Sequence, residues 1–83
     1  MILKRIEVKT GVISPKEAQT IVNRAMRFDS EIILEHKARK VNAKSIMGVM
    51  AAMFKKGDII MAIVKGDDEA EAAAEMERVL TRG

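Results

Sequence analysis

Ser45 is the residue whose type and position most clearly suggest chemistry. It follows Lys44 directly and opens the apolar run Ile46-Met47-Gly48-Val49-Met50, and no acidic residue lies three positions beyond it. A serine at such a point accepts a backbone N–H and caps the helix that follows. A phosphate on the same hydroxyl would lie at the positive end of the helix dipole. The sequence therefore predicts a helix cap at Ser45, in a position that also suits a phosphorylation switch.

A second serine opens the segment Ser14-Pro15-Lys16-Glu17. It combines a serine suited to capping, a proline at the first helical position and a glutamate at the third, which together form a capping box. We therefore expect Ser14 to begin a helix. This capping role is favoured over one in catalysis.

Other candidates for catalysis or metal binding are weak. His36 is the only histidine, and we expect it at the rim or in the core; Glu35, its neighbour on a strand, faces the other way. The acids Asp67-Asp68-Glu69 are typical of a helix start, where they complement the dipole. Cysteines are absent and the glycines do not cluster. The sequence predicts no catalytic residue, no metal and no cofactor, so we expect a protein that is not an enzyme.

The elements that position these residues follow from hydrophobic periodicity. Residues 2–8 alternate as a strand, which a turn at Thr10-Gly11 ends. A helix from Pro15 to about Arg27 follows, and its apolar residues recur at helical spacing. The stripe that we expect to be buried comprises Ala18, Ile21, Val22, Ala25 and Met26.

Two further strands are predicted at Glu31–His36 and Arg39–Asn42, joined by a Lys37-Ala38 turn where Gly or Asn would fit more comfortably. A short helix over Ile46–Phe54 should end at a left-handed Gly57. A fourth strand over Ile59–Lys65 and a last helix that begins at Asp67-Asp68-Glu69 complete the chain.

The order βαββαβα predicts an α+β open-faced sandwich, with a four-stranded antiparallel sheet and three helices on one face. Its 83 residues allow one domain, 1–83. Seven methionines and only two phenylalanines lead us to expect a soft core filled by methionine. We find no signal peptide or membrane span, and the absence of cysteine favours a cytoplasmic location.

Charge is unevenly distributed along the chain. Residues 1–66 hold 13 Lys and Arg against 6 Asp and Glu, whereas residues 67–83 hold 2 against 6. The basic part favours an acidic or phosphorylated partner. Direct nucleic-acid binding is not expected, because neither phenylalanine lies within a basic strand motif that could stack on bases.

The segment around Ser45 resembles the serine-phosphorylation region of the HPr family, the small phosphocarriers of the bacterial sugar phosphotransferase system. The residues that carry the resemblance are Glu35, Val41-Asn42, Lys44 to Met50, Gly57 and Gly66, and they span nearly all of the chain. HPr proteins also carry a Gly-x-His-Ala-Arg-Pro signature after the first strand. Here that region reads Gly11-Val12-Ile13-Ser14-Pro15-Lys16-Glu17, with Ser14 at the relay histidine's position. The chain thus resembles the Crh-like type, which lacks the phosphorylatable histidine.

This resemblance implies an HPr-like regulatory protein that does not relay phosphate to sugars. HPr kinase/phosphorylase would phosphorylate Ser45, and a LacI-type catabolite-control regulator would bind the product as a transcriptional cofactor. The partner-binding residues that it implies are Lys16, Lys44, Ile46, Met47 and Met50.

Four points stay open from the sequence alone. Lys16 is either a solvated residue of the first turn or a partner contact, and Met50 is either docking surface or core. The alternative function is a basic interaction or adaptor domain without a phosphorylation switch. The sequence does not give the oligomeric state.

Overall fold

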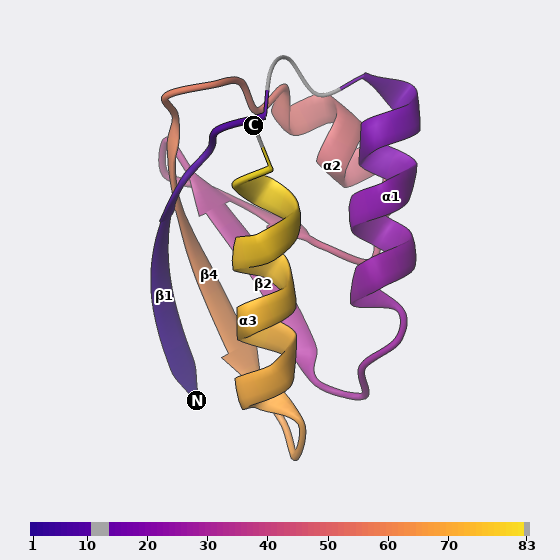
Figure 1. Ribbon diagram of the computed structural model, residues 1–83, viewed down its shortest axis with the longest axis vertical. Coiled ribbons are helices and arrows are strands. Elements are labelled where there is room, and N and C mark those ends of the chain that lie inside the picture. The colour runs from indigo at the N-terminus through magenta and orange to yellow at the C-terminus, as the bar shows by residue number, and fades with distance from the viewer. Residues whose placement is uncertain (11–13, 83) are drawn as a thin grey trace.

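The computed structural model describes residues 1–10 and 14–82, which form four strands and three helices (Figure 1). The strands are β1 (Ile2–Glu7), β2 (Glu31–His36), β3 (Arg39–Asn42) and β4 (Ile59–Lys65). The helices are α1 (Pro15–Ala25), α2 (Ile46–Ala52) and α3 (Glu69–Leu80). The predicted order and the open-faced sandwich are confirmed. The turn expected at Thr10-Gly11 falls partly outside the described residues.

The sheet has the strand order β1-β4-β2-β3, and all neighbouring strands are antiparallel. Its central strand β4 pairs Ile60 with Ile6 of β1 and Ala62 with Leu34 of β2, and all four of these side chains are buried. Burial alternates along β4, as the period of a strand with one covered face requires. The three helices cover this buried face, and the opposite face stays open (Figure 1).

The hairpin between β2 and β3 turns through two residues with positive φ, Lys37 at 52° and Ala38 at 65°. Such a turn matches the twist of paired strands and is favoured by Asn and Gly. The predicted turn is therefore confirmed, and its two residues adopt the left-handed conformation that Lys and Ala disfavour.

The core is mainly aliphatic, and the expected methionine filling is wrong. Met76 is the one methionine that is fully buried, whereas Met26 and Met53 are 63% and 69% exposed. Small residues explain the difference, because Ala18 and Ala25 of α1 and Ala72 and Ala73 of α3 are buried. Helices that present alanine approach closely, so less side-chain volume is needed between them.

Two helices end earlier than the sequence predicted. Helix α1 ends at Ala25, and Met26 leaves the expected buried stripe for solvent. Helix α2 ends at Ala52, and Met53 itself adopts the left-handed conformation with φ 53°, in place of Gly57. Leaving the helix here lets Phe54 become fully buried. Gly57, with φ 95°, serves the next turn instead and donates its N–H to the carbonyl of Val8 at 2.8 Å.

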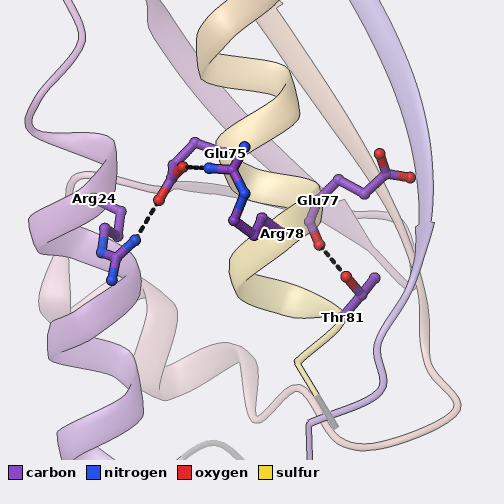
Figure 2. A network of polar contacts seen from close by, with 5 residues as sticks. All are labelled: Arg24, Glu75, Glu77, Arg78 and Thr81. Atoms are coloured by element: carbon purple, nitrogen blue, oxygen red, sulfur yellow. Dashed lines mark hydrogen bonds and ion pairs between the residues drawn. The ribbon is translucent and has the colours of Figure 1, made fainter.

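A polar network ties α1 to α3 (Figure 2). Arg24 of α1 donates to Glu75 of α3 at 2.5 Å, and Arg78 binds the other oxygen of the same carboxylate. Glu75 is buried, with only 9% of its side chain exposed. The bond from Arg24 holds the pKa of Glu75 below its usual value, with the charge of Arg78 adding to the effect. A buried carboxylate that is paired in this way remains ionised.

Candidate functional site

Ser45 caps α2 as the sequence predicted. Its backbone is extended, with φ −107° and ψ 113°, and its Oγ accepts the N–H of Gly48 at 3.1 Å. A Cβ at residue 48 would lie 3.3 Å from this oxygen, tighter than an ordinary van der Waals contact. Glycine therefore leaves space beside the hydroxyl.

The residues before Ser45 fix how the chain enters the helix. The side chain of Asn42, the last residue of β3, accepts the N–H of Lys44 at 2.8 Å, and its carbonyl accepts the N–H of Ser45 at 2.9 Å. Ala43 between them is fully buried. An Asn that bonds to the backbone two residues on forms a turn, so the serine is presented at a defined point between strand and helix.

Lys44 is held by the protein itself. Its Nζ donates to the carbonyl of Phe28, in the loop after α1, at 2.8 Å. The sequence predicted Lys44 as a partner contact, and no signal indicated this bond across 16 residues. The ammonium group is therefore held at the loop after α1, and any contact that it makes with a partner must share it with Phe28.

An apolar surface adjoins the serine. We call Ile46, Met47 and Met50 the α2 face. Met47 is 79% exposed and Met50 is 41% exposed, so the open question about Met50 is resolved in favour of surface. Ile46 is half-buried and packs against the core, while Val49 on the other side of the helix is fully buried. The face thus has a fixed edge at Ile46 and two mobile thioether side chains beside it.

Ser14 caps α1, and its Oγ accepts the N–H of Glu17 at 3.2 Å. The capping box is only partly formed as predicted, since the Glu17 carboxylate accepts from the Ser14 hydroxyl at 3.2 Å. Ser14 and Lys16 line a cavity of about 400 Å³ between the start of α1 and the end of α3. Its other lining residues are Thr10, Glu17, Thr20, Ile21, Val79 and Arg82. Lys16 is exposed at this cavity and lies outside the α2 face.

His36 lies in the core, within the range predicted for it, but its partner was missed. It is 7% exposed, and its Nε2 lies 2.9 Å from the carboxylate of Asp58. The ring also meets Phe54 edge-on, with centroids 5.1 Å apart. Burial opposes the ionisation of Asp58, but the N–H of Lys55 and the nearby His36 together bring its pKa below the usual value. No local sequence motif predicts the pair of His36 and Asp58, because His36 precedes α2 in the sequence and Asp58 follows it.

Asp68 also acts differently from the prediction. It makes no side-chain bond to its own helix and instead accepts the backbone N–H groups of Asp29 and Ser30 at 2.9 and 3.0 Å, together with the Ser30 hydroxyl. These bonds lower the pKa of Asp68, and the bond from the Ser30 hydroxyl has the largest effect. Its carboxylate therefore holds the loop between α1 and β2. Asp67-Asp68-Glu69 thus has a structural role through Asp68.

Two features are absent from residues 1–10 and 14–82, a metal site and a membrane-spanning helix. No group of His, Asp and Glu side chains there is arranged to hold a metal ion. No helix in the same ranges has the length and apolar character needed to cross a membrane.

Comparison with known proteins defines the class. The family model for the HPr component of the phosphotransferase system, described by its phosphorylation site, matches residues 6–82. The chain belongs to the HPr family.

Within that family, the chain is similar to Crh-type members. It is 46% identical to the HPr-like protein Crh of Halalkalibacterium halodurans over 74 residues, which cover 87% of each chain. The solved phosphocarrier HPr of Bacillus anthracis matches with a TM-score of 0.90 and 31% identity, over 95% of both chains. A crystal structure of the catabolite-repression protein Crh of Bacillus subtilis, a domain-swapped dimer, matches with a TM-score of 0.77 and 38% identity over 96% of this chain and 93% of that one. The predicted resemblance to Crh-like HPr proteins is confirmed.

The start of α1 separates this chain from a histidine phosphocarrier. Ser14 stands there, and the one histidine of the sequence is buried at the end of β2 against Asp58.

Proposed function

We propose that the protein is a regulatory HPr-like protein of carbon catabolite repression that is switched by phosphorylation of Ser45 and does not relay phosphate. One observation carries this proposal. The Ser45 hydroxyl sits at the start of α2, directly beside an exposed apolar face, and it follows Lys44, which is held by its bond to Phe28. The relatives named Crh support the catabolite-repression context.

The proposed modification is a phosphoryl transfer by HPr kinase/phosphorylase. The Ser45 Oγ attacks the γ-phosphorus of ATP, the bond to ADP breaks, and the hydroxyl proton passes to a base of the kinase. The product adds about −1.5 to −2 charge at neutral pH, at a helix N-terminus and next to Lys44. An Arg or Lys of a LacI-type regulator would form charge-assisted bonds to this phosphate.

The α2 face supplies the apolar part of the proposed complex. Met47 and Met50 offer flexible side chains that adapt to more than one surface, which suits docking to both a kinase and a regulator. Binding would thus need two features together, the phosphate for charge and the methionines for buried area.

The absence of relay follows from the chemistry of Ser14. A phosphate ester of serine is too stable to pass its phosphoryl group onward, unlike a phosphoramidate on imidazole. The Ser14 oxygen is also engaged in the cap of α1. Lys16, at the same cavity, would act as a partner contact and supply a point charge without the two-pronged geometry of arginine.

The switch is tested with purified kinase, ATP and a catabolite-control regulator. We expect one phosphate on the wild-type protein and on Ser14→Ala, and none on Ser45→Ala, by intact mass. In calorimetry the phosphoprotein should bind the regulator, with affinity falling as salt rises. Met47→Ala should weaken this complex about tenfold, whereas Leu3→Ala, which trims a similarly exposed side chain on the open sheet face, should not. If unphosphorylated protein and Ser45→Ala bind the regulator as tightly as the phosphoprotein does, the switch is overturned in favour of the adaptor function.

The non-relay property is tested separately. Phosphoenolpyruvate and the first enzyme of the phosphotransferase system should leave no acid-labile phosphate on this chain, while a histidine-bearing HPr in a parallel reaction acquires one. Phosphohistidine at His36 would contradict the proposal.

A further inference from the structure

The open face of the sheet carries more apolar surface than a solvated face needs. Side chains that point away from the helices include five large apolar residues, and Leu3 and Ile59 among them are 62% and 42% exposed. The five are Leu3, Ile33, Ile59, Met61 and Ile63. A contiguous apolar patch with a charged rim marks an interaction surface.

The strand register arranges four of these residues in two rows that cross β1, β4 and β2, and Ile59 lies next to Glu7 at the end of the patch. One row is Leu3, Ile63 and Ile33, and it is apolar throughout. The next row is Arg5, Met61 and Glu35, with opposite charges on either side of the central strand. Within the described residues, neither Arg5 nor Glu35 takes part in an ion pair.

We propose that this face binds a second copy of the chain, through a two-fold axis parallel to the strands and above β4. Such an axis leaves the position of each residue along the strand direction unchanged, and it places β1 of one copy over β2 of the other. Arg5 of each copy then faces Glu35 of the other, and Leu3 faces Ile33. The β4 residues Ile63 and Met61 each meet their own counterpart. The interface is isologous, so every contact off the axis is made twice.

The remaining geometry is compatible with this arrangement. Two sheets packed face to face keep their strands nearly aligned, which the proposed axis does. Lys65 would meet its own copy at the strand end, but Glu31 is its cross-strand neighbour and lies next to it. The α2 face belongs to the helical layer, on the other side of the sheet, so the two surfaces are separate (Figure 1).

Charge reversal tests this pairing. Sedimentation velocity over a range of concentrations should show a reversible monomer–dimer equilibrium for the wild-type protein. Arg5→Glu and Glu35→Arg should each raise the dimer dissociation constant by roughly tenfold or more, because each creates two like-charge contacts. The double variant restores opposite charges and should bring the constant back to near the wild-type value. Glu71→Arg, at an exposed position of α3 on the helical side of the sheet, serves as a control and should leave it unchanged.

A further variant changes Ile63, which lies on the proposed two-fold axis. Ile63→Lys places two like charges face to face and should abolish the dimer, with folding confirmed by circular dichroism. A wild-type protein that stays monomeric overturns the proposal. A dimer whose dissociation constant does not change with the charge reversals also overturns it, as would be the case for a dimer formed by strand exchange or by edge pairing. The same holds if the double variant does not restore the wild-type dissociation constant. None of these substitutions touches the α2 face, so they leave the phosphorylation proposal to its own test.

Discussion

Glu75 offers a sharp test of the contact between α1 and α3 (Figure 2). Glu75→Gln keeps the shape of the side chain and removes the charge that Arg24 and Arg78 share. Hydrogen bonds to charged groups contribute about 1.5 to 3 kcal/mol. The Arg24 and Arg78 side chains are 31% and 65% exposed, so solvent screens part of that contribution. We expect a loss of about 1 to 2 kcal/mol in the free energy of unfolding, or roughly 5 to 15 °C in Tm for a domain of this size.

The pH dependence of this loss has a definite sign. The pKa of Glu75 is lower in the folded protein than in the unfolded chain. Its contribution to stability is therefore complete above the ordinary glutamate pKa and disappears as the pH falls through the lower, folded value. The wild-type protein and the Gln variant should differ most at neutral pH and converge in strong acid.

Urea unfolding at several pH values measures both effects. Glu77→Gln is the matched control, because Glu77 lies on the same helix and pairs with Lys4 at 3.3 Å while 45% of its side chain is exposed. That variant should lose less than about 0.5 kcal/mol. If both variants lose the same amount, or if the loss at Glu75 does not change with pH, the buried carboxylate does not stabilise the protein as argued.

Two other substitutions test local features. Ser14→Ala should lower the free energy of unfolding by about 0.5 to 2 kcal/mol through loss of the α1 cap, measured by urea unfolding; an unchanged stability would show that the cap is dispensable. Gly66→Ala should destabilise the protein by about 2 kcal/mol or more, because its Cβ would lie 2.5 Å from the Ser30 Oγ and 2.7 Å from the Ser30 Cα, with φ at 152°. If Gly66→Ala has the same Tm as the wild-type protein, this account of the turn between β4 and α3 is wrong.

The sequence predicted those features that short-range patterns encode. Alternation placed the strands, the capping serines placed the starts of α1 and α2, and the hairpin appeared even with Lys37 and Ala38 in place of better turn residues. The ends of α1 and α2 were less accurate, because burial of Phe54 and exposure of Met26 depend on packing against distant elements.

Contacts between distant parts of the chain were not predicted. Glu75 bonds to Arg24 across 51 residues, and Asp68 bonds to Ser30 across 38. Neither pair has a periodic or spaced signature. The same limit applies at the candidate site, where Ser45 and the exposed Met47 were anticipated but the bond from Lys44 to Phe28 was not.

The cap at Ser45 also has a consequence for the rate of the proposed phosphorylation. In the proposed reaction, the oxygen that attacks ATP is the same oxygen that accepts the Gly48 N–H, so the cap and the kinase compete for it. Helix α2 has only seven residues, and a helix this short depends on packing for its stability. Opening its first turn therefore costs less than unfolding the domain. The rate of Ser45 phosphorylation should then follow the opening of that turn, and hydrogen exchange at the Gly48 amide reports the same event in the free protein.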